Sequence, residues 1–223
     1  MASDEWQFVR FTFGMAVLST LLLIPPGLAV AWALARGKWR GKALVETLVT
    51  LPLVLPPVVT GLVLLKLLGR RGIIGKWAHD SLGIDMAFTW RAVVMALAIM
   101  SFPLFVRAAR TAFEGVNSEL EQIAKTLGAG TWKVFFTITV PLAKRGLLAG
   151  VMLAFARALG EFGATITVAG NIPGQTTTTS VAIYQHIQTG EDSRAWMLAG
   201  ISAVLAFAAV LAAQIMSGTR KET

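Results

Sequence analysis

Two long runs without a charged residue constrain this chain more than any other feature of its sequence. Residues 11–35 and 195–219 each form a run of 25 uncharged and mostly apolar residues. A helix rises about 1.5 Å per residue and the hydrocarbon core of a bilayer is about 30 Å thick, so each run is long enough to cross it. Lipid offers no hydrogen-bond partner to peptide groups, so such segments must fold as helices. The sequence therefore predicts an all-α integral membrane protein.

The composition supports this prediction and excludes several classes of site. Of 223 residues, 55% are hydrophobic and only 14% are charged, whereas roughly 25% are charged in ordinary soluble domains. The net charge of +8 is typical of basic cytoplasmic loops. It does not indicate nucleic-acid binding, because basic and aromatic residues do not interleave as in a strand-binding groove. The absence of cysteine excludes disulfides, thiolate metal sites and cysteine nucleophiles.

Five transmembrane helices are expected in a single transmembrane domain covering residues 1–223. Their expected positions are about 11–35, 46–68, 91–112, 139–163 and 195–217. Prolines 25 and 26 predict a kink in the first helix, and prolines 52, 56 and 57 predict breaks in the second. The third has only 15 residues between Arg91 and Arg107. It can span the membrane only if the side chains of these arginines snorkel to the interface or if protein shields the helix ends. The polar stretches 69–89 and 171–194 are expected to be connectors.

The distribution of cations predicts the orientation. With the N-terminus outside and the C-terminus in the cytoplasm (N-out/C-in), twelve Lys and Arg residues lie on the cytoplasmic side and seven outside. This excess agrees with the positive-inside rule. The first apolar segment is too long for a signal-peptide core and is interpreted as a retained span. The expected location is the cytoplasmic (inner) membrane, with several passes.

Residues 114–133 form a strongly polar loop, within which residues 118–130 predict a short surface helix. Ser118 and Glu121 have the spacing of a capping box. Leu120, Ile123, Ala124 and Leu127 recur at the spacing of one apolar helix face. The glycines at 128 and 130 are expected to end the helix. An amphipathic surface helix alone does not identify a function, because many membrane proteins carry one.

The spacing after this helix resembles that of ABC importer permeases. Their pattern is Glu-Ala-Ala, three residues, Gly, nine residues, Ile, one residue and Leu-Pro. Gly128, Ile138 and Pro141 match it, as does Ala124, whereas Gln122, Ile123 and Val140 depart from it. The resemblance implies that residues 118–130 are a cytoplasmic coupling helix seated in a groove of a separate ATPase subunit, which supplies ATP hydrolysis. The residues implied in this coupling are Ser118, Glu119, Glu121, Gln122, Ala124, Gly128, Ala129 and Gly130.

Three further stretches resemble molybdate permeases in particular. They are Leu-Pro-Leu-Val-Leu-Pro-Pro-Val-Val at 51–59, Gly-Arg-Arg-Gly at 69–72 and Leu-Gly-Glu-Phe-Gly-Ala-Thr at 159–165. The resemblance implies a transport subunit, not an enzyme, that carries molybdate and tungstate. It also implies a homodimer with two cytoplasmic ATPase subunits and an extracytoplasmic molybdate-binding protein, without a cofactor. A sulfate-type oxyanion permease is the alternative, since sulfate permeases share the Gly-Glu-Phe-Gly type of segment.

Two charged residues inside the fourth predicted span admit two interpretations. Arg157 and Glu161 are four residues apart and share one helix face. They form either a structural ion pair or a site that guides the anion, since ionisable groups within a membrane are often functional. We favour the pair, because Glu161 would cancel the cation that attracts an anion. The threonine run in 176–180 is expected to be an ordinary loop, with docking of a binding protein as the alternative.

Other classes fit the sequence less well. Residues 69–77 have the wrong glycine spacing for a phosphate-binding loop, and Trp77 stands where Ser or Thr should follow the lysine. His79 and His186 lie far apart without paired ligands, so no metal site is expected. A membrane enzyme would need a cluster of acids or histidines at helix spacing. A self-sufficient secondary transporter would be expected to show an inverted repeat, and none is detectable.

Overall fold

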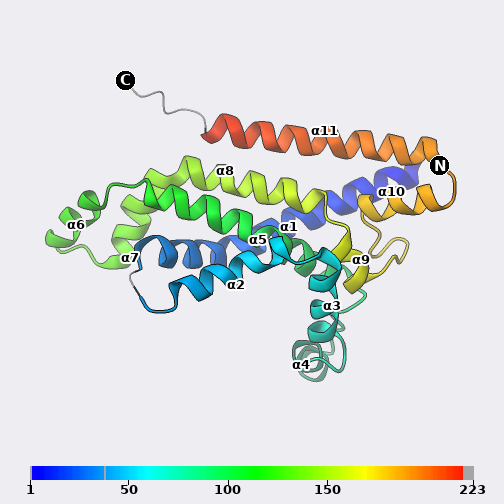
Figure 1. Ribbon diagram of the computed structural model, residues 1–223, viewed down its shortest axis with the longest axis horizontal. Helices are drawn as coiled ribbons and strands as arrows, with labels where there is room; N and C mark the ends of the chain where they lie inside the picture. Colours follow the sequence, from blue (N-terminus) through cyan, green and yellow to red (C-terminus); the bar gives the residue numbers. More distant parts are fainter. Residues whose placement is uncertain (1, 38, 218–223) are drawn as a thin grey trace.

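Long helices lying side by side dominate the fold. The computed structural model describes residues 2–37 and 39–217, and every regular element within them is helical. Helices α1 (Ala2–Arg36), α5 (Trp90–Glu114), α8 (Val140–Leu159) and α11 (Asp192–Ser217) run along the long axis of the molecule (Figure 1). α1, α5, α11 and the helical stretch Thr131–Leu159 are each long and apolar enough to cross a membrane. The all-α prediction is confirmed.

Helix α5 is the centre of the bundle. It packs against α1 on one side and α8 on the other, and its Val93, Leu97 and Phe105 are fully buried. The 15-residue stretch between Arg91 and Arg107 therefore has neighbouring protein around it, as its short length required. α5 is itself longer than that stretch: it runs from Trp90 to Glu114 and contains both flanking arginines.

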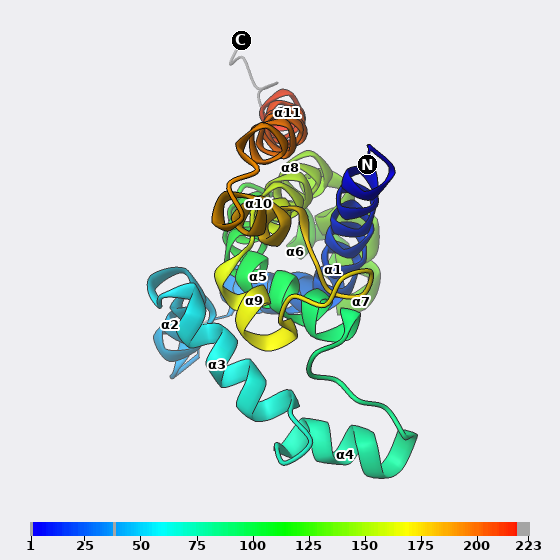
Figure 2. The same cartoon turned by 90° about the vertical axis from the view of Figure 1, so that its right-hand side faces the viewer.

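The second apolar segment is broken at its prolines. It consists of α2 (Lys42–Val54) and α3 (Pro57–Leu68), and the chain bends by 111° between α2 and the stretch from α3 through α4 (Ile73–Leu82). Pro56 and Pro57 lie at the break, where proline fits the first turn of a new helix but cannot continue the old one. Figure 2 shows α3 and α4 projecting from the bundle on the side away from α11. The segment counts as a fifth span only if the bent pair is taken as one.

Two stretches expected to be polar connectors contain helices. α4 lies within 69–89, and α10 (Thr179–Gln188) lies within 171–194, following α9 (Gly163–Ala169). The loop expected at 176–180 is present up to Thr178, and α10 begins at Thr179. The threonines at 176–179 are all buried. The hydroxyl of Thr178 accepts a hydrogen bond from the backbone N–H of Val181 and so caps α10. Threonine suits this position because its hydroxyl accepts from a backbone N–H of the first turn that would otherwise have no partner.

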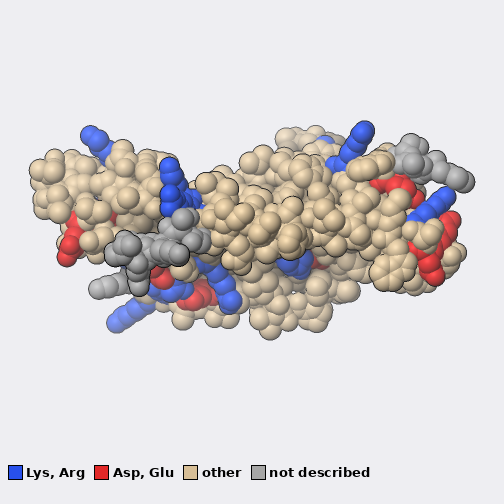
Figure 3. Space-filling view, turned by 90° about the horizontal axis from the view of Figure 1, so that it is seen from above, with Lys and Arg blue, Asp and Glu red and all other residues tan. Residues whose placement is uncertain are grey.

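The surface separates into charged ends and an apolar middle. Figure 3 shows Lys, Arg, Asp and Glu side chains gathered mainly toward the two ends of one face, with a broad belt of other residues between them. Large apolar side chains of α11, including Trp196, Val204 and Phe207, are more than half exposed. α6 (Ser118–Thr126) and the C-terminal end of α11 lie at one end of the molecule, and the N-terminal end of α1 lies at the other (Figure 1).

Candidate coupling site

The predicted coupling helix is present as α6, but its N-terminal cap is not the predicted capping box. Asn117 is the N-cap, and its side-chain oxygen accepts a hydrogen bond of 2.9 Å from the backbone N–H of Glu119. Helix α6 therefore begins at Ser118, one residue earlier than the capping box requires. The third helical position is Leu120 instead of Glu121. The capping box at Ser118 and Glu121 was wrong because Asn117 is itself a strong capping residue.

The C-terminal end of α6 confirms the predicted stop at Gly128. This glycine has φ +88°, a left-handed conformation that residues with a Cβ atom rarely adopt. The N–H of Gly128 donates to the carbonyl of Lys125, and the N–H of Ala129 donates to that of Ala124, both at 3.0 Å. These two bonds form a Schellman motif, which satisfies the last carbonyls of the helix. α6 is thus fixed at both ends.

The face that α6 turns outward fits a docking role. Leu120, Ile123 and Leu127 of the predicted apolar stripe are 45%, 56% and 83% exposed. Apolar side chains exposed together on one face mark a surface that binds a partner or lipid. Of the predicted coupling residues, the structure leaves these exposed or half-buried: Ser118, Glu119, Gln122, Ala124, Gly128, Ala129 and Gly130.

Glu121 is the exception, because it points into the protein. One of its carboxylate oxygens, Oε1, accepts a hydrogen bond of 2.9 Å from Arg36 Nη2 and one of 2.7 Å from Thr139 Oγ1. The same guanidinium nitrogen also donates to the backbone carbonyl of Val116 at 3.0 Å. Arg36 is the last residue of α1, and its side chain is 23% exposed. This contact could not be predicted from the sequence, since Arg36 and Glu121 are 85 residues apart.

Thr139 belongs to an irregular turn that leads into α8. α7 (Thr131–Val134) continues into a π-helical turn, η1 (Phe135–Thr139), and then into α8. The N–H of Val140 donates to the carbonyl of Phe135, five residues back. Pro141 lies immediately afterwards and has no N–H to continue the regular ladder, so a widened turn here is physically reasonable.

An aromatic cluster joins the same elements through apolar contacts. The ring of Trp32 from α1 lies 6.2 Å from that of Trp132 in α7 and 5.3 Å from that of Phe135 in η1. Phe135 in turn lies 5.9 Å from Phe113 of α5. Ring pairs at these distances add stabilisation beyond the area they bury. The end of the 114–133 loop is therefore packed on the bundle.

The predicted pairing of Arg157 with Glu161 is present. Arg157 Nη2 lies 2.6 Å from Glu161 Oε2, and the side chain of Glu161 is only 1% exposed. The other oxygen of Glu161 accepts a hydrogen bond of 2.8 Å from the backbone N–H of Ala164, at the start of α9. Both carboxylate oxygens therefore have partners within the protein, which agrees with the structural interpretation.

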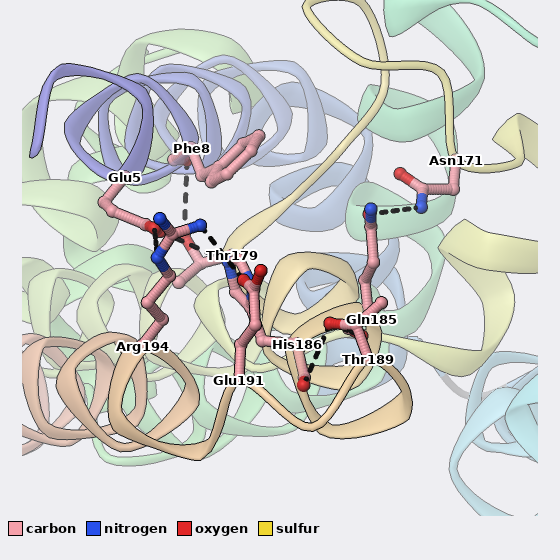
Figure 4. Close-up of polar contacts among 9 residues, drawn as sticks. All are labelled: Glu5, Phe8, Asn171, Thr179, Gln185, His186, Thr189, Glu191 and Arg194. Atoms are coloured by element: carbon pink, nitrogen blue, oxygen red, sulfur yellow. Dashed lines mark hydrogen bonds and ion pairs between the residues drawn. The ribbon is translucent and has the colours of Figure 1, made fainter. Parts of the chain in front are cut away.

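A second polar cluster, drawn in Figure 4, lies where α10 meets the N-terminal end of α1, at the opposite end of the molecule from α6 (Figure 1). His186 of α10 lies between Glu191, 2.7 Å from its Nδ1, and Glu5 of α1, 3.4 Å from its Nε2. Arg194 of α11 lies 3.0 Å from Glu191 and 3.7 Å from Glu5. The cluster connects three helices near the N-terminal end of α1. No group of three or more His, Asp or Glu side chains suited to a metal ion is found where the structure describes side chains.

Nearby, the buried threonines connect α10 to α1. The backbone N–H of Thr179 donates to the hydroxyl of Thr12 at 2.7 Å, and its own hydroxyl donates to the carbonyl of Phe8 at 3.2 Å. Burial leaves Thr176–Thr179 no free surface, so the structure does not favour this run as a docking site for a binding protein.

The connector before α5 is held by a separate ion pair. Arg70 donates hydrogen bonds of 2.8 and 2.7 Å to the two carboxylate oxygens of Asp85. The hydrogen bond from Arg70 lowers the pKa of Asp85, with a smaller contribution from His79. Both partners are exposed, so the pair adds little to stability.

Comparison with known proteins places the chain among transport subunits. Residues 24–218 match the family described as "Binding-protein-dependent transport system inner membrane component". The molybdenum transport system permease protein ModB of Escherichia coli (strain K12) is 50% identical over 223 residues, covering 100% of this chain and 97% of the relative. ModB of Haemophilus influenzae is 45% identical, with coverages of 96% and 93%. The sulfate transport system permease protein CysW of Synechocystis is 35% identical, with coverages of 93% and 75%.

Solved structures with little sequence identity share the fold. A bacterial alginate ABC transporter in complex with alginate pentasaccharide-bound periplasmic protein matches with a TM-score of 0.69 at 19% identity, covering 95% of this chain and 77% of the other. The MetNI methionine ABC transporter matches with a TM-score of 0.63 at 14% identity, covering 97% and 96%. The resemblance inferred from the motifs is thus confirmed. The chain belongs to the family of binding-protein-dependent transport system inner membrane components.

Proposed function

We propose that this protein is the membrane-spanning subunit of an ATP-driven importer that carries molybdate across the cytoplasmic membrane. One observation carries the proposal: half of all residues are identical to those of a molybdenum permease along the whole chain. The protein needs no catalytic residues of its own in this role. A separate ATPase hydrolyses ATP, and the permease converts the resulting motion into opening and closing of a pathway.

Molybdate is favoured over sulfate by the extent of the similarity. The sulfate permease relatives are 35% and 38% identical, and this chain covers only 75% and 63% of their lengths. Tungstate has nearly the same size and charge as molybdate, so we expect it to be carried too. A sulfate-type oxyanion permease is the second candidate, and it retains the same assembly.

The proposed assembly is a homodimer with two cytoplasmic ATPase subunits and one extracytoplasmic binding protein. Each chain contributes five spans, the bent α2–α3 segment included, with the N-terminus outside and the C-terminus in the cytoplasm. The exposed apolar stripe of α6 supports the ATPase contact, because such anchors can lie in a groove of a partner. One five-helix chain encloses a pathway poorly, which supports a pore on a two-fold axis.

Uptake by the reconstituted complex tests the proposal. Vesicles containing the permease, its ATPase and the binding protein should accumulate labelled molybdate or tungstate only when ATP is present. Omission of the ATPase or of the binding protein is the control. Sulfate uptake at equal or better efficiency would transfer the assignment to the second candidate. Uptake by the permease alone would instead indicate a self-sufficient transporter, and chemical conversion of the substrate would indicate a membrane enzyme.

A further inference from the structure

The contact between Arg36, Glu121 and Thr139 joins three elements that carry different parts of the proposed mechanism. Arg36 ends α1, Glu121 lies in the first turns of α6, and Thr139 ends the π-helical turn before α8. A single oxygen, Glu121 Oε1, accepts from both of the other side chains at 2.9 and 2.7 Å. Because both bonds meet at one atom, a displacement of α6 acts on the end of α1 and on the turn before α8 together.

The burial of this contact makes it costly to break. The side chain of Glu121 is 10% exposed, and Thr139 is 1% exposed. A carboxylate that loses its cation in such a place keeps a desolvated and uncompensated charge. Exposed ion pairs hold geometry poorly, whereas a buried charge-assisted pair is shorter and stronger. The contact is therefore suited to holding α6 at a fixed distance from the bundle.

We infer that Glu121, Arg36 and Thr139 are positioning residues that transmit the displacement of α6 to α1 and α8. This inference rests on the proposed function, in which the ATPase pushes α6. Glu121 then acts inside the permease, whereas the exposed residues of α6 contact the ATPase. Two paths leave α6: the polar contact to Arg36 at the end of α1, and the contact to Thr139, which continues directly into α8. The aromatic cluster around Trp32 and Phe135 keeps these ends aligned.

The test compares the variants E121Q, R36Q and R36Q/E121Q with the unchanged protein, in complexes reconstituted with ATPase and binding protein. Three quantities are measured: co-purification of the ATPase, ATP hydrolysis stimulated by the loaded binding protein, and molybdate uptake per ATP hydrolysed. Single variants leave a buried charge without its partner, so they can lose stability for that reason alone. The double variant removes both charges and avoids this cost, so it gives the decisive result.

For the double variant we expect normal ATPase co-purification and continued ATP hydrolysis. Uptake per ATP should fall by at least roughly fivefold, the lower end of ordinary couplings between sites. T139V, which keeps the shape but removes the hydroxyl donor, should lower the same ratio to a smaller extent. E46Q is the matched control, because Glu46 pairs with Arg110 at 2.6 Å and links α2 to α5 without touching α6. It should leave uptake per ATP unchanged.

If molybdate uptake per ATP hydrolysed is unchanged in R36Q/E121Q, the inference is wrong. Loss of ATPase co-purification from the double variant would also overturn it, since Glu121 or Arg36 would then belong to the docking surface. Failure of the proposed function looks different. In that case the unchanged protein itself would neither retain the ATPase nor take up molybdate when ATP is supplied.

Discussion

At the scale of single residues, the pair of Arg157 and Glu161 yields the sharpest prediction. Removing one partner of a buried ion pair typically costs about 3–5 kcal/mol, because the other charge stays desolvated. Arg157→Ala should therefore lower the thermal stability of the detergent-solubilised protein. Adding Glu161→Gln should restore much of it, since the amide oxygen can still accept from the N–H of Ala164. Fluorescence-detected unfolding measures both changes.

The same variants separate the structural role from a role in guiding the anion. Arg157→Lys keeps the cation and should stay close to the unchanged protein in stability. If the pair is structural, the double variant should regain uptake together with stability. A stable double variant without uptake would show that Arg157 acts on the anion, contrary to our interpretation.

At the scale of the element, the C-terminal cap of α6 can be tested independently of its side-chain contacts. Gly128 has φ +88°, and a Cβ atom added there would meet nothing within 4 Å. Gly128→Leu should therefore strain the backbone by roughly 1–2 kcal/mol without a clash of the new Cβ atom. The strain is confined to the end of α6, so the membrane helices should stay folded. We expect an inserted permease that binds the ATPase poorly or uses ATP without transport.

A matched position allows a control for this prediction. Gly83 has φ +65° at the end of α4 and equally open surroundings. Gly83→Leu adds similar strain far from α6 and should leave ATPase binding intact. Co-purification of the ATPase and ATP-driven uptake are the measurements. Normal values for both in Gly128→Leu would mean that the cap does not matter for coupling.

At the scale of the whole molecule, the separation of the two ends predicts the orientation. α6 and the C-terminal end of α11 share one end of the molecule, and an ATPase can reach α6 only from the cytoplasm. A reporter fused after Thr223 should be cytoplasmic. A tag inserted at Gly190, an open turn between α10 and α11, should be accessible from outside. An external C-terminus would contradict the proposed N-out/C-in arrangement.

Much of the helical framework was predictable, because apolar length alone determines which segments can cross a bilayer. The break at Pro56 and Pro57 and the stop at Gly128 were predictable as well, since both follow from local backbone chemistry. The partners of Glu121 were not predictable. Arg36 was indistinguishable from other loop cations, and only the folded chain brings the C-terminal residue of α1 within hydrogen-bond distance of Glu121.

Two features that the sequence did not reveal have a common cause in polar side chains that hydrogen-bond to the backbone. The threonines at 176–179 were expected in an ordinary loop, and the sequence did not show that they are buried or that the hydroxyl of Thr178 caps α10. Asn117 displaced the expected capping box by one residue for a similar reason. Hydrogen-bonding capacity predicts that such groups need partners, but the sequence does not say whether those partners are water or protein.

The bonds between Thr179 and α1 have a consequence for how the chain is made. Thr12 and Thr179 are 167 residues apart, and ribosomes add roughly 5–20 residues per second. The first helix therefore waits about ten to thirty seconds in the membrane before its partner is synthesised. During that interval the hydroxyl of Thr12 relies on the carbonyl of Phe8 within its own helix, to which it donates at 2.8 Å. The first helix can thus insert alone with this hydroxyl satisfied, and the oxygen of Thr12 can still accept the N–H of Thr179 later.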